Sequence, residues 1–352
     1  MSVETFIKRD EELESFLEGK ETPPKTTARH FREFNNNASH FLVDGQSEDN
    51  KEAFLPGLKF GEVRDTETKQ VFRIFILNEE LLKEGKVPTI LTFPYNKYNI
   101  GIDDPYSQEL AQIMAQWDVP IIGIESPSVG GSSDITKEQE DNLNLGGKPF
   151  EEISRSLLRA LSDIIPSNKY GEVDFAGYSQ GGITALSNAE VADEFGFKVR
   201  RVFLLDPPGI TDHTEGKGRK GAILGLGRAV REEAADLNFY GFNDKEYSSF
   251  VESLSIKNDD ISLRKMQILY SAATGRVVLP EILKSVLLKQ PQIKITFVNG
   301  SESKITLTDD RKNFFKEFSD NRIRRIVLPG DTHSVGVNVR RIGWLFRFTM
   351  KD

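Results

Sequence analysis

The sequence contains no cysteine among its 352 residues. Disulfide bonds, thiolate metal sites and cysteine nucleophiles are therefore excluded. Histidine is also scarce, with only His30, His40, His213 and His333 in the chain. No stretch approaches the roughly 18 consecutive apolar residues that a membrane span requires. The N-terminus is acidic and polar, which is not typical of a secretory signal.

Positive charge is in deficit as well. The chain has 46 Lys and Arg residues against 54 Asp and Glu residues, which gives a net charge of -8. Nucleic-acid binding needs a basic face, so we expect no nucleic-acid partner. With neither a membrane span nor a signal, we expect a soluble, cytoplasmic protein. Nothing in the sequence indicates the oligomeric state.

From residue 87 onward, short apolar runs alternate with helix-length segments. The runs are VPTILTF, VPIIGI, VDFAGY, VRRVFLL, IKITFV and IRRIVL. Such runs are typical of parallel strands that are buried on both faces and linked by helices. The preceding segments LKFGEVR and QVFRIFIL, separated by a polar turn, predict a β-hairpin. Together they predict an α/β fold with an eight-stranded, mostly parallel sheet flanked by helices.

The same pattern divides the chain into three parts. Residues 1–54 form an N-terminal extension, with a helical pattern over residues 2–20. Residues 210–290 contain no strand-like run but several helical patterns, such as LRKMQILYSAAT and LPEILKSVLL. We therefore expect a helical lid inserted after the sixth strand. Residues 55–209 and 291–352 form the core, which closes with a short helix in NVRRIGWLFRF.

One segment indicates nucleophilic chemistry. Residues 177–181 read Gly-Tyr-Ser-Gln-Gly and lie between a buried strand and a helix. In this G-x-S-x-G arrangement a sharp turn exposes the serine hydroxyl, and the glycines give the turn room. The dipole of the following helix favours negative charge nearby. Ser179 is therefore the candidate nucleophile.

A serine hydroxyl needs a nearby base, and imidazole titrates in the right range. Two of the four histidines, His30 and His40, belong to the N-terminal extension, and His213 belongs to the predicted lid. Only His333 follows a predicted core strand, at the sheet edge where Ser179 is expected. We therefore predict His333 as the general base.

This strand, elbow and helix, set in an alternating pattern, resembles the α/β-hydrolase family over about residues 55–350. Residues 125–133 (ESPSVGGSS) are similar to the family's Asp-x-x-Gly-x-Gly-x-Ser loop, with Glu125 and Ser128 in place of the Asp and the first Gly. Residues 328–334 (LPGDTHS) resemble its Gly-x-x-His loop. The resemblance implies the α/β-hydrolase fold and a triad in the chain order Ser, acid, His.

The resemblance leaves two choices for the acid. The family usually places it after the seventh strand, where this chain has Ser303, with Glu302 one residue earlier. Some lipases instead use the end of the sixth strand in a Leu-Asp-Pro-Ala pattern, and residues 205–208 read Leu-Asp-Pro-Pro. We expect Asp206, with Glu302 as the alternative, to orient the histidine.

For the oxyanion hole, the resemblance implies the backbone N–H of Gln180 as one donor. The second donor should come from the loop after the third strand, where the family usually has His-Gly and this chain has Phe93 and Pro94. Because proline has no N–H, Tyr95 is the candidate.

We expect serine-dependent hydrolysis of a carboxylic ester, thioester or related acyl bond in a small-molecule acyl substrate. A non-catalytic ligand-binding or partner-binding protein on the same fold is an alternative, as is an amidase or peptidase. No metal or cofactor is expected. Residues 216–221 match G-x-G-x-x-G but follow no strand, so they predict a solvated loop. Apolar lid residues would cover the substrate: Leu224, Leu226, Phe239, Tyr240, Phe242 and Tyr247.

Overall fold

The computed structural model describes residues 58–93, 111, 114, 118–145, 147–165, 171–235, 261–333 and 339–350. The extension over residues 1–54, with its predicted helix, lies outside this part of the chain. The strands are β1 (Lys59–Arg64), β2 (Val71–Leu77), β3 (Thr89–Thr92), β4 (Ile121–Ile124), β5 (Glu172–Tyr178), β6 (Lys198–Leu205), β7 (Lys294–Gly300) and β8 (Ile323–Leu328). The helices are α4 (Glu79–Lys83), α6 (Lys137–Asn144), α7 (Glu151–Leu161), α9 (Gln180–Val191), η2 (Ala192–Phe195), α10 (Gly218–Ala235), α12 (Ile261–Thr274), α13 (Leu279–Lys289), α14 (Thr308–Glu317) and α15 (Val339–Met350).

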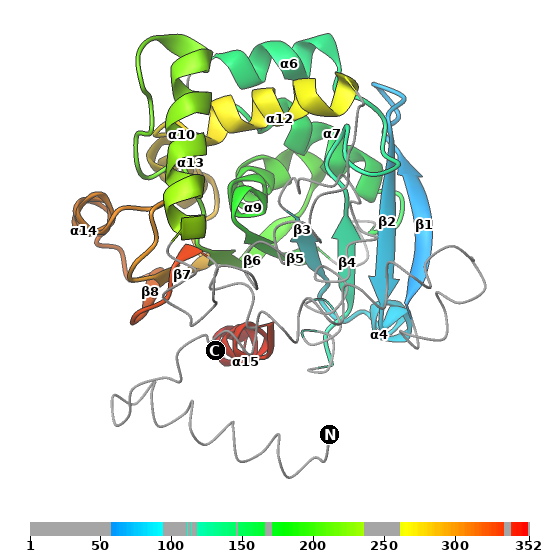
Figure 1. Cartoon of the computed structure of the whole chain (residues 1–352). Helices are drawn as coiled ribbons and strands as arrows, with labels where there is room; N and C mark the ends of the chain where they lie inside the picture. The colour runs from blue at the N-terminus through cyan, green and yellow to red at the C-terminus, as the bar shows by residue number, and fades with distance from the viewer. Residues whose placement is uncertain are drawn as a thin grey trace, which may run out of the picture.

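The strands form one eight-stranded sheet in the order β1-β2-β4-β3-β5-β6-β7-β8. Strand β2 is antiparallel to both β1 and β4, and all the other pairs are parallel. The predicted hairpin and the mostly parallel sheet are confirmed (Figure 1). Strand β5 lies inside the sheet, between β3 and β6.

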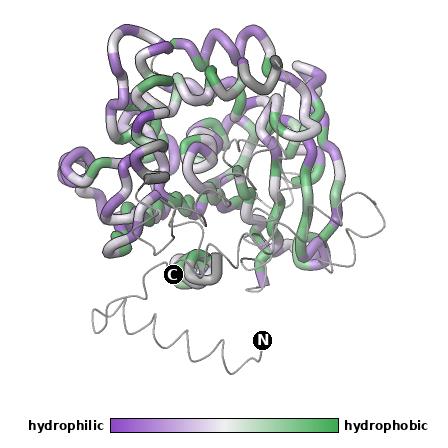
Figure 2. Tube along the Cα trace, viewed as in Figure 1, coloured by the Kyte–Doolittle hydropathy of each residue, from purple (hydrophilic) through white to green (hydrophobic). Residues whose placement is uncertain are grey.

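The inner strands β3, β4 and β5 are buried on both faces, as continuous apolar runs predict, whereas the edge strands β1 and β8 are partly exposed. Ile90 and Phe175 belong to the hydrophobic cluster on one face, and their neighbours Leu91 and Ala176 to the cluster on the other. Helices α7 and α9 pack against the first face, and α15 contributes to the second cluster. Figure 2 shows that hydrophobic residues are frequent in the strands of the sheet.

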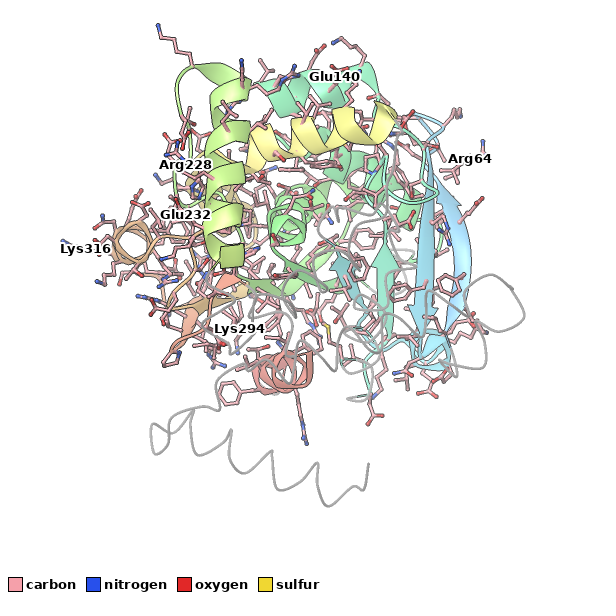
Figure 3. All side chains as sticks on the ribbon, in the orientation of Figure 1. Arg64, Glu140, Arg228, Glu232, Lys294 and Lys316 are labelled. Atoms are coloured by element: carbon pink, nitrogen blue, oxygen red, sulfur yellow. The ribbon has the colours of Figure 1, made fainter. Side chains whose placement is uncertain are left out.

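Helices α10, α12 and α13 occupy the interval between β6 and β7. Helix α10 packs on α12, which packs on α6, and these helices lie at the end of the molecule opposite α15 (Figure 1). The loop predicted for residues 216–221 is wrong from Gly218 onward, because α10 begins at that residue. The outward faces are charged, as Arg228 on α10 and Lys316 on α14 illustrate (Figure 3). Across the described ranges, no helix combines the length and the hydropathy needed to cross a bilayer.

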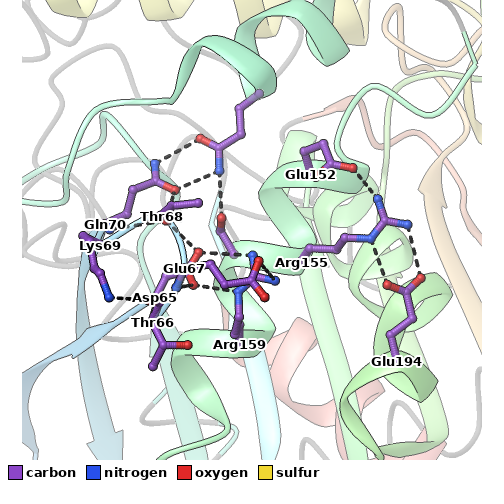
Figure 4. Close-up of polar contacts among 12 residues, drawn as sticks. Asp65, Thr66, Glu67, Thr68, Lys69, Gln70, Glu152, Arg155, Arg159 and Glu194 are labelled. Carbon is purple, nitrogen blue, oxygen red and sulfur yellow. Dashed lines mark hydrogen bonds and ion pairs between the residues drawn. The ribbon is translucent and has the colours of Figure 1, made fainter.

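A buried carboxylate fastens the β1–β2 turn to α7 (Figure 4). Asp65 accepts hydrogen bonds from Arg159 Nε at 2.6 Å, from Thr68 Oγ1 at 2.6 Å and from the Glu67 N–H at 2.9 Å. Burial alone would raise the pKa of Asp65, but these hydrogen bonds outweigh it and lower the pKa to about 2. Asp65 is therefore a structural anion that ties the edge of the sheet to a helix.

Candidate active site

Ser179 lies at the turn between β5 and α9. Its backbone has φ 53° and ψ −128°, outside the regions that non-glycine residues favour. Such a conformation is strained by about 1–3 kcal/mol and needs support from its surroundings. Part of that support is the hydrogen bond from the Ser179 N–H to the carbonyl of Leu205 on β6, at 2.8 Å. This is the strand-to-helix elbow that the sequence predicts.

Two glycines allow the elbow to close. A Cβ atom on Gly177 would lie 2.2 Å from the Gly181 carbonyl oxygen, and a Cβ on Gly181 would lie 2.4 Å from the Thr92 carbonyl oxygen. Neither contact is sterically allowed. Helix α9 therefore approaches β5 and β3 so closely only because both flanking positions lack a side chain.

Three side chains predicted from the sequence form a continuous chain of contacts. The Oγ atom of Ser179 lies 2.9 Å from Nε2 of His333. On the other side of the ring, Nδ1 of His333 lies 2.7 Å from Oδ2 of Asp206. The Asp206 side chain is fully buried, and that of His333 is 16% exposed. The arrangement allows a proton to pass from the serine hydroxyl to an imidazole that a carboxylate orients.

Asp206 follows β6 and is held on several sides. Its backbone has φ 40°, and its N–H donates to the Val298 carbonyl at 2.7 Å. Its Oδ1 accepts from Asn299 Nδ2 at 2.8 Å, and its Oδ2 accepts from Ser303 Oγ at 2.7 Å. Both donors come from the end of β7 or the loop after it. Two neutral donors therefore satisfy and orient the buried carboxylate.

The structure does not bring the alternative acid, Glu302, to the histidine ring nitrogen that Asp206 occupies. Glu302 is exposed, and its carboxylate accepts from the neighbouring Ser301 Oγ at 2.9 Å. Ser303 points instead toward Asp206, and the Thr306 N–H donates to the Ser303 hydroxyl at 3.2 Å. At Ser303, the position where the resemblance places an acid, this chain thus has a hydrogen-bond donor to Asp206, which follows the neighbouring strand β6.

A buried cation, Arg311, holds the loop that follows β7. Arg311 on α14 is 1% exposed. Its guanidinium donates to the carbonyls of Gly300 at 2.5 Å and Ser301 at 3.2 Å. Burial lowers the pKa of Arg311, and the negative charge of Asp206 opposes this shift. Arg311 therefore fixes the backbone between the two residues that hold Asp206 and supplies positive charge nearby.

The aromatic ring of Tyr178 lies against His333. The Tyr178 ring stacks on the His333 imidazole, with centroids 5.3 Å apart and planes 26° apart. The Tyr178 hydroxyl also donates to the His333 carbonyl oxygen at 2.9 Å. Sequence analysis missed this role and the roles of Asn299 and Ser303. A tyrosine next to the nucleophile was visible in the motif, but nothing local indicated its partner 155 residues away.

Of the two predicted oxyanion donors, Gln180 is the first residue of α9, directly after Ser179. Tyr95 lies outside the described residues, as do the lid residues Phe239, Tyr240, Phe242 and Tyr247. Leu224 is 50% exposed, and Leu226 is partly buried. Among the side chains that the structure describes, no three His, Asp or Glu residues form a group that could hold a metal ion.

No family model matches the sequence, and no curated protein matches it. Solved structures do. A thioesterase domain from the curacin biosynthetic pathway is 15% identical, with 82% of this chain and 99% of that chain covered and a TM-score of 0.51. An esterase from Pyrococcus furiosus is 13% identical, with 86% and 93% covered and a TM-score of 0.54. The Cif epoxide hydrolase from Acinetobacter nosocomialis is 14% identical, with 92% and 96% covered and a TM-score of 0.54.

These similarities extend over most of each chain at low identity, so they concern the fold. They agree with the eight-stranded, mostly parallel sheet and its flanking helices. This chain has the α/β-hydrolase fold.

Proposed function

We propose that this protein is a serine hydrolase that cleaves a carboxylic ester, thioester or related acyl bond. The observation that carries the proposal is the unbroken chain of short contacts from Ser179 through His333 to Asp206. A protein that only binds a ligand has no need for a buried carboxylate behind a histidine that contacts an elbow serine. The structural neighbours named as an esterase and a thioesterase favour the same chemistry.

In the proposed reaction, Ser179 Oγ attacks the carbonyl carbon of the substrate while His333 Nε2 takes the hydroxyl proton. Asp206 holds the tautomer with a proton on Nδ1 and stabilises the imidazolium. Collapse of the tetrahedral intermediate expels the alcohol or thiol, which receives the proton from His333, and leaves an acyl-enzyme. Water then attacks the acyl group by the same proton path and releases the acid.

The negative oxygen of the intermediate needs hydrogen-bond donors. We propose the backbone N–H of Gln180 as one of them, because it lies at the N-terminus of α9, where the helix dipole favours negative charge. Tyr95 stays the predicted source of the second donor.

We also propose that residues 210–290 act as a lid over a core made of residues 55–209 and 291–352. The enzyme would then prefer substrates with small or medium apolar acyl groups. The support is the position of α10, α12 and α13 between β6 and β7, the strands whose ends carry Asp206, Asn299 and the Ser303 loop. Exposed Leu224 on α10 offers apolar surface for such a role.

The test is hydrolysis of a series of nitrophenyl esters of increasing acyl length, with the matching anilides measured beside them. We expect ester hydrolysis that is lost in Ser179→Ala. Anilide hydrolysis at a comparable rate would move the assignment to an amidase. No turnover of any substrate by the folded protein would favour the non-catalytic alternative.

A further inference from the structure

Tyr178 makes two contacts with one residue, and that residue is the proposed general base. Its ring lies on the imidazole face of His333, and its hydroxyl donates to the backbone carbonyl of the same residue. Ser179 and Asp206 contact the two nitrogens at the edge of the imidazole. The edge contacts set the direction of the ring nitrogens, and the face contact limits the tilt of the ring plane.

The backbone beneath Tyr178 is well fixed. Tyr178 is the last residue of β5 and pairs in parallel register with Leu205 of β6. The next residue, Ser179, is held to Leu205 by its own N–H. The loop before His333 is also confined, because the carbonyl oxygens of Asp331 and Thr332 lie against Gly300, each 2.3 Å from where a Cβ would be. The tyrosine is thus a rigid support for a residue that directly follows a tightly packed loop segment.

The chemistry of the stack favours one protonation state. The face of an aromatic ring is electron-rich and attracts a cation placed over it. His333 becomes a cation when it takes the serine proton, so the contact is stronger after that proton transfer than before it. An interaction that strengthens during the reaction accelerates it.

We infer that Tyr178 is a positioning residue, which holds the His333 imidazole toward Ser179 and Asp206 and stabilises its protonated form. This inference rests on the proposed function. It differs from a packing role, because a packing residue would affect stability but would leave the titration of the imidazole unchanged.

Two substitutions separate the two contacts. Tyr178→Phe keeps the ring and removes the hydroxyl, and Tyr178→Leu removes both. The readout is the NMR titration of the imidazole signals, with His333 assigned among the four histidines through a His333→Gln variant. Tyr270→Leu is the matched control, since Tyr270 stacks on Phe150 with centroids 5.4 Å apart and planes 17° apart.

Removing the stack makes the imidazolium less stable, so the ring loses its proton at lower pH. We expect the His333 midpoint to fall in Tyr178→Leu by several tenths of a pH unit, and to stay near the wild-type value in Tyr178→Phe and in Tyr270→Leu. We expect kcat/KM for a nitrophenyl ester to fall about threefold in Tyr178→Phe and about tenfold or more in Tyr178→Leu. If Tyr178→Leu does not fold, Tyr178→Met takes its place.

An unchanged His333 midpoint in the folded Leu or Met variant would overturn the inference. The titration needs no turnover, so it gives an answer even if the wild-type protein hydrolyses nothing. Absence of hydrolysis by the wild type would count against the proposed function, and an unchanged midpoint would count against the role of Tyr178 alone.

Discussion

Ser303 donates its hydroxyl proton to Asp206 Oδ2 at 2.7 Å, the same carboxylate oxygen that contacts His333 Nδ1 at 2.7 Å. Ser303 and His333 therefore share one acceptor atom, which belongs to a fully buried carboxylate. Because the two contacts converge, any rotation of the carboxylate toward one partner changes its distance to the other. The geometry gives the loop after β7 a part in orienting the acid, although that acid is carried by β6.

Removing the Ser303 hydroxyl should impair the reaction without abolishing it. A hydrogen bond to a charged group contributes about 1.5–3 kcal/mol, of which only the share that orients Asp206 affects the rate. We expect Ser303→Ala to lower kcat by about 3- to 30-fold with little change in KM. Ser301→Ala is the control, since its hydroxyl contacts Glu302 and the Gly330 N–H instead. A similar loss in both variants would argue against a specific role for Ser303.

Two substitutions, each of which replaces a carboxylate by the amide of the same size, test which acid orients His333. Asp206→Asn removes the charge behind the imidazole and disturbs the tautomer, so we expect kcat to fall about 10³-fold or more. Glu302→Gln alters an exposed carboxylate that contacts Ser301, and we expect its rate to stay within about twofold of wild type. Steady-state kinetics of the two variants decides between them. A large loss in Glu302→Gln with an active Asp206→Asn would reverse the assignment.

Arg311 should contribute substantially to the free energy of unfolding, although it does not contact the proposed nucleophile, Ser179. Its guanidinium is buried, and it satisfies the carbonyls of Gly300 and Ser301. Arg311→Met leaves these carbonyls without their donor and removes a cation near Asp206, so we expect the free energy of unfolding to fall by about 2–4 kcal/mol. Urea denaturation measures this loss. Arg324→Met, a change on the surface of β8, should have a much smaller effect.

The pH dependence of stability should reflect Asp65. Its pKa is lowered in the folded protein to about 2, so its contribution is fully present above the unfolded value near 3.8 and is lost as the pH falls toward 2. Allowing for the partial exposure of Arg159, we expect about 1–2 kcal/mol at pH 7. Asp65→Asn should remove this stability at neutral pH and flatten the acid side of the stability curve between about pH 4 and 2.

Glu79 provides the comparison for Asp65. Hydrogen bonds from Lys59 and Lys83 also lower its pKa to about 2, but it lies at the surface with both lysines largely exposed. Solvent screens such pairs, so Glu79→Gln should change the unfolding curve little. Equal effects of the Asp65 and Glu79 substitutions on chemical denaturation at pH 7 would contradict the role given to burial.

Much of the fold was predictable because its determinants are local. Continuous apolar runs such as that of β4 allow burial on both faces, and the segments between successive runs are long enough for crossover helices. The elbow was predictable for a similar reason, since Gly177 and Gly181 are required by contacts within a few residues of Ser179 or with the adjacent strand.

The surroundings of the acid were not predictable to the same degree. Whether Asp206 or Glu302 reaches His333 depends on how two loops from different strands meet, and no local pattern encodes that distance. The pairing of Ser303 with Asp206 joins residues 97 positions apart. Ser128 is a further example: it has φ 58° where the resemblance places a glycine, and its hydroxyl bonds with Asp134 and Ile135 support that conformation.

Labelling with a fluorophosphonate probe is the most direct test of whether Ser179 is an activated nucleophile. Wild-type protein, Ser179→Ala and His333→Ala are treated in parallel after their folding has been verified by circular dichroism. The proposed triad predicts rapid labelling of the wild type, none of Ser179→Ala and a greatly reduced rate for His333→Ala, because the probe reacts with a serine that a base activates. A folded wild-type protein that is not labelled, or a Ser179→Ala variant that is labelled at the wild-type rate, would contradict it.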